Sequence, residues 1–402
     1  MLLVKAKQGG GPATGRPFSF GKRADVALPV AHGEDSVTRV EVYREAKALF
    51  VPGARMVDEA ECALSVALAI LFAHLIGAHN ISWAAFSGFV VMRGRADESL
   101  VRGILRLIGT AIGAGLALLL VPSLAAVPPL AALVAGLVAT GSLYGAMTGK
   151  RSYAWLLFGL TFEMILLDTL EHPALVAADF ARTRMLEVTA GTVACVLVSF
   201  ASAVTVRRIW PAAPTPPTER VGWHRHAFRH AAQAGVAVAL LPLLGQIVRI
   251  PELAQSSITV MASMLVPVSS IGASGFVPVS RRLVQRVAGC LAGAAMAALF
   301  LFAAHGSAAV LIGGTLLGVI VGRHVENGKS SIAYVGTQFV LAILVTLVPD
   351  DYGSAAIGPA LNRLTGILVG MALLEPVLLA WHLIAPSAPA KPAAAAGSSG
   401  TE

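Results

Sequence analysis

Apolar runs of about 20 residues recur along most of the chain, and short polar segments separate them. A helix of about 20 apolar residues is long enough to cross the hydrocarbon core of a bilayer. The sequence lacks the alternating segments of about ten residues that are typical of a membrane β-barrel. The pattern therefore predicts an all-α polytopic membrane protein with about 12 transmembrane helices.

The predicted spans fall into two sets of six. The first six cover residues 60–78, 81–93, 103–122, 126–147, 153–170 and 185–206, and the second six cover residues 226–246, 255–276, 284–304, 307–322, 331–348 and 364–384. The chain then divides into a cytoplasmic N-terminal tail (1–57), a first six-helix membrane repeat (58–207), a Pro-rich cytoplasmic linker (208–225), a second six-helix membrane repeat (226–385) and a disordered C-terminal tail (386–402).

The two sets look like tandem copies because one pattern, an arginine followed by glycines three and seven residues later, recurs in both. It is found, complete or in part, in four predicted helices: Arg106 with Gly109 and Gly113, Arg184 with Gly191, Arg286 with Gly289 and Gly293, and Arg363 with Gly366 and Gly370. Corresponding arginines are 180 and 179 residues apart, which indicates a duplicated unit of that length. Glycines at this spacing let another helix approach closely, so we expect these glycines to serve helix packing.

Composition and charge agree with a membrane protein. Hydrophobic residues make up 56% of the chain and charged residues 13%, and the mean hydropathy is +0.75; a soluble domain carries about 25% charged residues. The net charge of +8 comes from basic residues in short segments beside apolar runs, as in cytoplasmic loops. We therefore expect membrane lipid and no nucleic acid as a partner, with both termini in the cytoplasm.

The four arginines of the pattern are the main candidates for function. An ionisable side chain within a membrane costs several kcal/mol of free energy unless it faces water, the interior of a helix bundle or a partner of opposite charge. Arg106 and Arg286 begin predicted helices that leave the cytoplasm, so snorkelling and the positive-inside rule offer a second explanation for them. The positive-inside rule does not explain Arg184 and Arg363, which begin predicted helices on the outer side of the membrane. We expect all four to bind an anionic substrate, since a guanidinium can hold a carboxylate in a bidentate manner.

Two acidic residues lie within predicted spans and are candidates for a proton relay. Glu163 lies in the middle of its span, and Glu187 follows Arg184 by three residues. Either carboxylate could bind and release a proton as access to the site alternates. In the simpler alternative, Glu187 only neutralises Arg184. If the fifth and sixth spans pack together, the two acids and Arg184 would form one polar cluster.

Signatures of enzymes and of bound cofactors are missing from the sequence. It has no Gly-rich loop ending in Gly-Lys-Ser/Thr, no Gly-x-Ser-x-Gly and no His-Glu-x-x-His. The three cysteines, Cys62, Cys195 and Cys290, are not spaced for a metal, and His226 and His230 share a helix face without an acidic or cysteine partner. We therefore expect no enzymatic activity, no cofactor, no metal and no ATP drive.

The chain resembles the fusaric acid resistance (FUSC) family, also called aromatic acid exporters. The matching text includes Ile81-Ser-Trp83, the stretch from Leu100 through Arg102 and Arg106 to Thr110, the stretch from Arg184 to Gly191, and the copies at Arg286 and Arg363. The resemblance covers roughly residues 58–385. A sizeable soluble domain separates the halves of larger members, whereas only residues 208–225 intervene here, so the chain is similar to a short form without that domain.

The resemblance implies a multi-pass protein of the bacterial inner membrane that exports aromatic carboxylic acids or related toxic compounds. Together with the arginines and buried acids, it leads us to expect a proton-coupled secondary transporter for a small organic anion. A passive, channel-like anion conduit and a non-transporting membrane scaffold subunit remain the alternatives. A periplasmic adaptor and a homo-oligomer are both open as protein partners.

Overall fold

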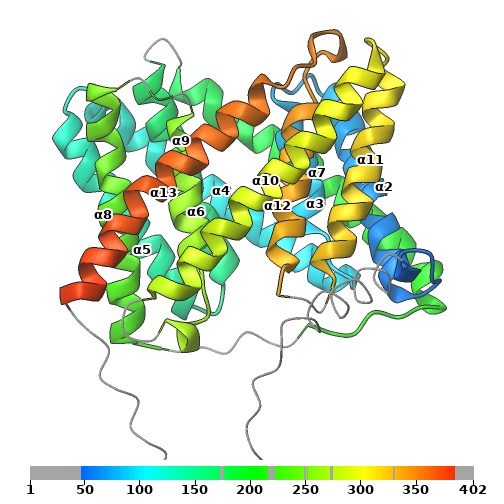
Figure 1. The fold of residues 1–402 in the computed structure, drawn as a ribbon, viewed down its shortest axis with the longest axis horizontal. Coiled ribbons are helices and arrows are strands. Elements are labelled where there is room, and N and C mark those ends of the chain that lie inside the picture. Colours follow the sequence, from blue (N-terminus) through cyan, green and yellow to red (C-terminus); the bar gives the residue numbers. More distant parts are fainter. Residues whose placement is uncertain are drawn as a thin grey trace, which may run out of the picture. The chain divides into compact units, whose positions relative to one another are not determined.

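The computed structural model describes residues 47–172, 176–215, 222–248, 250, 252–271, 275–328 and 331–384. It divides the chain into two units, Met1–Ala48 and Leu49–Glu402, and all helices discussed below belong to the second unit. Every regular element in the described ranges is a helix (Figure 1). The all-α prediction is therefore confirmed, whereas most of the predicted tails and residues 216–221 of the predicted linker lie outside the described residues.

The helices follow one another with short connections. Their bounds are α2 (Ala54–Leu75), α3 (Ile81–Val91), α4 (Ala96–Leu124), α5 (Pro128–Thr148), α6 (Ser152–Glu171), α7 (Ala177–Val204), η1 (Val206–Arg208), α8 (Arg225–Ile247), α9 (Leu253–Met264), η2 (Val268–Ser270), α10 (Phe276–Ala304), α11 (Ala308–Glu326), α12 (Ala333–Leu347), η3 (Tyr352–Ser354) and α13 (Gly358–Ile384). Each predicted apolar span coincides, at least in part, with one of the α-helices.

Eight of the described helices are long and apolar enough to cross a membrane, namely α4, α5, α6, α7, α8, α10, α11 and α13. Helices α3, α9 and α12 have 11, 12 and 15 residues, fewer than the roughly 20 that a full crossing needs. Helix α2 has 22 residues but carries Asp58, Glu59 and Glu61 in its first half. The chain is thus a multi-pass helical membrane protein, and the number of twelve crossings stays a prediction.

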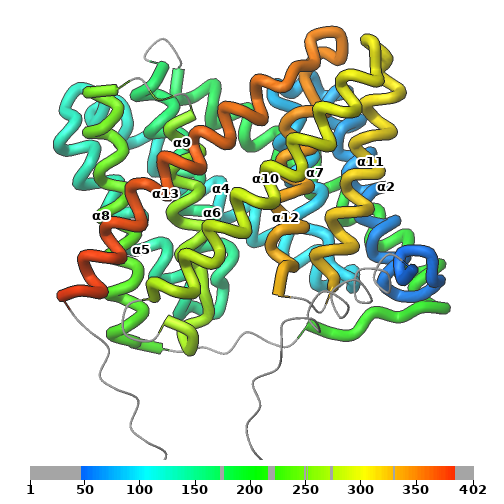
Figure 2. The backbone as a smooth tube through the Cα atoms, viewed as in Figure 1, coloured from blue at the N-terminus to red at the C-terminus, as the bar shows by residue number. Residues whose placement is uncertain are grey.

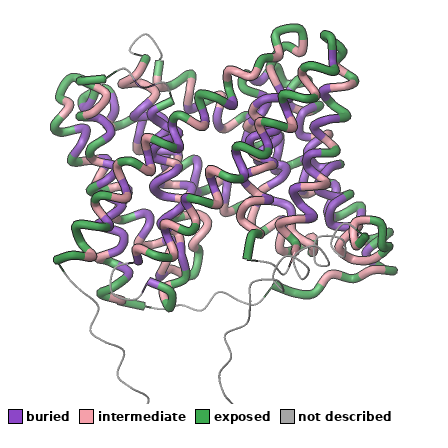
Figure 3. Tube along the Cα trace, viewed as in Figure 1, coloured by how far each residue is buried: buried purple, intermediate pink, exposed green. Residues whose placement is uncertain are grey.

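The outward faces of the helices are apolar. Buried residues follow the inward sides of the helices, and many exposed positions lie on their outer sides (Figure 3). Large exposed side chains include Leu119, Leu299, Phe302 and Ile384, which are 73%, 70%, 81% and 81% exposed. Such extensive apolar surface is unusual for a protein in water. In a bilayer these side chains contact lipid tails instead.

Helices from the N-terminal part of the chain (α2–α7) pack against helices from the C-terminal part (α8–α13). Helix α8 lies along α5 at one side of the unit, and α2 lies along α11 at the other (Figure 2). Helix α4 packs on α6, and α10 packs on α12 in the same manner. The interior between these pairs is therefore lined from both parts of the chain.

The glycines of the repeated pattern lie at corresponding helix contacts. A Cβ added at Gly109 on α4 would lie 2.5 Å from the carbonyl oxygen of Ala154 on α6, and one added at Gly289 on α10 would lie 2.5 Å from that of Val335 on α12. A side chain at either position would push the helices apart. For the other pattern glycines the nearest backbone oxygen would lie between 2.2 and 3.0 Å away: Gly113, Gly191, Gly293, Gly366 and Gly370.

The two short helices α3 and α9 begin in the same way. Each follows a residue with left-handed backbone, Asn80 (φ 55°) or Glu252 (φ 63°). The N–H groups of Asn80 and the next residue donate to the Asp350 carboxylate at 2.9 and 2.8 Å, and those of Glu252 and the next residue donate to the Glu171 carboxylate at 3.0 Å each. Burial, followed by the charge of Glu171, raises the pKa of Glu252. Each part of the chain thus caps the short helix of the other.

Candidate functional site

A cavity of about 240 Å³ lies in the interior, between helices of both parts of the chain. Five arginines line it, namely Arg106, Arg184, Arg282, Arg286 and Arg363. Four aromatic side chains also line it, namely Trp83, Phe86, Tyr153 and Tyr334. No carboxylate is among the described residues that form its wall. The structure therefore brings all four arginines of the sequence pattern to one cationic and aromatic cavity.

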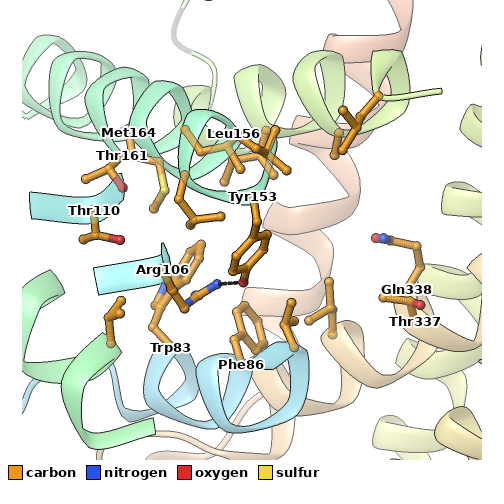
Figure 4. A pocket seen from close by; sticks show the side chains of 18 of the residues that line it. Trp83, Phe86, Arg106, Thr110, Tyr153, Leu156, Thr161, Met164, Thr337 and Gln338 are labelled. Atoms are coloured by element: carbon orange, nitrogen blue, oxygen red, sulfur yellow. Dashed lines mark hydrogen bonds between the residues drawn. The ribbon is translucent and has the colours of Figure 1, made fainter. Parts of the chain in front are cut away.

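Arg106 is held by two side chains within this cavity. It is only 7% exposed. Its Nε donates to Ser87 Oγ at 3.1 Å, and its Nη1 donates to the Tyr153 hydroxyl at 2.8 Å (Figure 4). The guanidinium of Arg102, one turn earlier on α4, lies 3.9 Å from the centre of the Tyr153 ring. Tyr153 thus holds two successive arginines of α4.

The same arrangement is found on α10 and α12. Arg286 is 1% exposed, and its Nη1 donates to the Tyr334 hydroxyl at 3.2 Å. The guanidinium of Arg282 lies 4.5 Å from the centre of the Tyr334 ring, and Nη1 of Arg282 donates to the carbonyl oxygen of Leu265. The two tyrosines are 181 residues apart in the sequence, close to the spacing of the arginines.

Arg184 on α7 has a carboxylate partner. Its Nη1 donates to Glu187 Oε2 at 3.0 Å, and both side chains are buried. Its guanidinium also lies 3.9 Å from the Trp83 ring centre and 4.8 Å from that of Phe180. The ion pair that the sequence suggested between these residues is therefore present, and it neutralises one of the five cations.

Arg363 on α13 has amide partners in place of a carboxylate. Its Nη1 donates to Gln255 Oε1 at 2.8 Å, and its Nη2 donates to Gln338 Oε1 at 3.3 Å. At the position that corresponds to Glu187, three residues after the arginine, this helix has Gly366. The guanidinium is 5% exposed, and these amide partners carry no negative charge that would compensate it.

Glu163 does not join the polar cluster that the sequence suggested. The cavity-lining residues of α6 recur every three or four positions, including Tyr153, Leu157 and Thr161, and Glu163 lies off that face. One turn before it, Gly159 contacts Ser142 and Met261. Both Glu163 oxygens are fully buried without a hydrogen-bond partner in the described ranges. The cluster prediction is wrong for Glu163 because the rotation of α6 turns its side chain away.

The depth of the α4 and α10 arginines also differs from the prediction. Helices α4 and α10 begin at Ala96 and Phe276, so Arg106 and Arg286 lie ten residues into their helices. Ten residues correspond to roughly 15 Å along the helix axis. The prediction that these arginines begin their helices is wrong, because a polar first section precedes the apolar run. All four arginines of the pattern line one cavity.

Several cavity residues were not singled out from the sequence. These are Phe86, Tyr153, Tyr334 and Gln338, to which the cavity partner Gln255 can be added. The tyrosines carried a detectable signal, since their spacing of 181 residues matches that of the arginines. The glutamines carried none, because isolated amides in apolar helices are not distinctive.

A second charged cluster joins α2 to α11 and η1. Arg323 Nε donates to Asp58 Oδ2 at 2.6 Å, and Arg207 donates to both carboxylate oxygens of Glu61 at 2.8 and 2.6 Å. Asp58 also lies 3.6 Å from Arg207, and all four side chains are buried. The sequence assigned the two arginines to cytoplasmic loops only, so their acidic partners on α2 were not foreseen.

Comparison with known families identifies a related family. A family model described as "Fusaric acid resistance protein-like" matches residues 68–198. This segment contains Trp83, Arg106, Tyr153 and Arg184, which line the cavity from the first part of the chain. The resemblance inferred from the sequence is confirmed over this segment. No curated protein and no solved structure gave a significant match.

Proposed function

We propose that this chain, a membrane protein of the fusaric acid resistance type, is a secondary transporter that moves an organic anion out of the cytoplasm. The observation that carries the proposal is the cavity itself, where five arginines and four aromatic rings meet without a lining carboxylate. Buried cations in a low-dielectric interior favour an anionic ligand. The planar guanidinium suits a carboxylate, and the rings suit a planar apolar body. An aromatic carboxylate has both parts.

The proposal places the substrate between two tandem six-helix repeats. Support comes from equivalent contacts 180 or 181 residues apart, such as Arg106 with Tyr153 and Arg286 with Tyr334. Many secondary transporters bind substrate where two such repeats meet, and move the repeats against each other to change access. The lining of the cavity supports this part of the proposal, because it comes from both parts of the chain.

Proton coupling through Glu187 or Glu163 completes the proposal. Glu187 neutralises the cavity cation Arg184. A proton taken up by Glu187 would leave one more uncompensated positive charge beside the cavity and strengthen its attraction for an anion. Glu163 is the second buried carboxyl group on a helix that lines the cavity. Both roles are tested by substitution below.

Reconstitution into proteoliposomes tests the proposal. We expect radiolabelled benzoate to exchange against internal benzoate, and the double change Arg184→Ala, Arg363→Ala to abolish this counterflow because two cavity cations are lost. The matched control is Arg151→Ala, Arg208→Ala, which removes the same charge from two exposed positions and should leave the rate unchanged. Full activity of the cavity variant would contradict a substrate role for its arginines. Single-channel currents would identify a conduit, and no flux through the unmodified protein would favour the scaffold.

A further inference from the structure

We infer that the cavity binds its anion in one orientation, with the carboxylate at Arg286 and Arg363 and the ring against Trp83, Phe86 and Tyr153. This inference rests on the proposed function and refines it, because it assigns different parts of the solute to the two halves of the chain. The argument starts from the differences between otherwise equivalent positions.

The first difference is in charge. Arg184 is neutralised by Glu187 at 3.0 Å, whereas Arg363 donates to the uncharged amide oxygens of Gln255 and Gln338. Position 366, which corresponds to 187, is a glycine. The uncompensated positive charge of the cavity is therefore greater on the side of α13 and α10.

The second difference is in free donors. Nε and Nη2 of Arg286 and Nε of Arg363 are buried and have no hydrogen-bond partner among the described residues. Both side chains line the cavity and interact electrostatically with each other. Leaving charged donors buried and unpaired is unfavourable. One carboxylate bound beside both guanidinium groups would offset their mutual repulsion, and a small rotation of either side chain would bring an unpaired donor to one of its oxygens.

The third difference is in aromatic content. Helices α3 and α9 begin at Ile81 and Leu253, so Trp83 and Phe86 on α3 correspond to Gln255 and Ile258 on α9. Both rings of α3 line the cavity, whereas of the two corresponding residues on α9 the aliphatic Ile258 lines it. Figure 4 shows Trp83, Phe86 and Tyr153 grouped at one side of the view, with Gln338 at the other.

The reversed orientation is less favourable on the same grounds. Arg106 already donates from Nε to Ser87 and from Nη1 to Tyr153. Arg184 already holds Glu187. A carboxylate bound there would meet one guanidinium that Glu187 already neutralises and another whose Nε and Nη1 are already engaged, and the ring of the solute would lie against a wall that has fewer aromatic side chains.

The test compares each arginine with its equivalent in the other half. The full chain, purified in detergent, is titrated with benzoate by isothermal titration calorimetry. We expect Arg286→Gln and Arg363→Gln each to weaken binding by about tenfold or more, since each loses charge-assisted hydrogen bonds to the carboxylate. The matched variants Arg106→Gln and Arg184→Gln should weaken it by less than about threefold.

The ring side is tested with isosteres of the probe. Benzamide, which is neutral, should bind the unmodified protein at least about tenfold more weakly than benzoate, and Arg286→Gln should not weaken it further. Trp83→Leu should remove the preference for benzoate over cyclohexanecarboxylate, because the planar ring loses its aromatic contact. If a glutamine variant does not fold, Arg286→Lys and Arg363→Lys keep the charge but lose the planar fork and should still weaken benzoate binding.

The possible outcomes distinguish a wrong binding orientation from a wrong solute class. Larger losses at Arg106 and Arg184 would overturn the orientation, and so would equal losses at all four positions. Benzoate binding that does not depend on any of these arginines would also overturn it. No benzoate binding by the unmodified protein would refute the proposed solute class itself.

Discussion

Glu187 and Gly366 occupy corresponding positions on α7 and α13, and the difference between them sets the charge balance of the cavity. The carboxylate of Glu187 pairs with Arg184, while Arg363 remains uncompensated. Glu163 is a different case, because it is fully buried and has no cationic partner in the described part of the chain. The two acids therefore test two ways of moving a proton, one that involves a cavity arginine and one that does not.

The substitution Glu163→Gln or Glu187→Gln should separate transport from the proton gradient. In proteoliposomes with an imposed pH gradient, we expect the responsible variant to transport benzoate at the rate seen without a gradient, because an amide cannot carry a proton. Counterflow without a gradient should persist. Glu375→Gln is the control, since the Glu375 carboxylate only accepts a hydrogen bond from Ser280 at 3.1 Å. An unchanged response to the gradient in both variants would reject proton coupling through these acids.

Helix contacts in this protein depend on glycines whose neighbours are backbone atoms. The closest approaches of α4 to α6 lie at Gly109 and Gly113, where an added Cβ would lie 2.5 and 2.4 Å from carbonyl oxygens. Backbone atoms cannot move aside as a flexible side chain can. These contacts bring the cavity residues of α4 and α6 together, so their distance also sets the width of the site.

Gly113→Ala should destabilise the protein by about 1–3 kcal/mol, as overpacking does in other helical cores. Gly115→Ala, two residues further along α4, is a suitable control because nothing lies within 4 Å of its added Cβ. That control should be neutral or stabilising by up to about 1 kcal/mol, since alanine favours helix. Thermal unfolding in detergent measures both, and equal midpoints would show that the close approach at Gly113 is not required.

The contact between α2 and α11 depends on buried ion pairs. Arg323→Gln should destabilise the protein by about 3–5 kcal/mol, because buried Asp58 would lose its closest cation and keep the longer, 3.6 Å contact with Arg207. Adding Asp58→Asn should recover part of this loss in a double-mutant cycle. Arg95→Gln breaks the exposed pair with Asp97 and should not change the unfolding midpoint. Equal effects of Arg323→Gln and Arg95→Gln would mean that the buried pair adds no stability.

The packing of the helices into the whole molecule was harder to predict from the sequence than the helices themselves. The helices could be predicted, because lipid requires every backbone polar group to be satisfied within its own helix. The four arginines could be proposed as functional, because a buried charge is expensive. Their meeting at one cavity could not, since it depends on how helices from distant parts of the chain pack. The direction in which Glu163 points could not be predicted either, because the sequence of α6 has no strongly apolar side opposite a polar one.

The predicted orientation of the whole molecule places both termini and the basic loops in the cytoplasm. In a background with Cys62, Cys195 and Cys290 changed to alanine, we expect Ser354→Cys to react with an impermeant maleimide in intact spheroplasts. Ser354 follows Asp350 and Asp351, an acidic pair that the predicted orientation places outside the cytoplasm. Arg151→Cys should react only after the membrane is permeabilised. Both positions are exposed, so access depends on the side of the membrane. The reverse labelling would invert the topology.

The reciprocal caps of α3 and α9 have a consequence for biosynthesis. The Asp350 carboxylate that caps Asn80 lies 270 residues further along the chain. While a ribosome is still producing that downstream part, the first turn of α3 lacks its acceptor, which is worth roughly 1 kcal/mol. The cap of α3 therefore forms only after almost the entire polypeptide has been translated. Two fragments divided between α7 and α8 would each lack the carboxylate that caps their short helix, so co-expression should restore both caps.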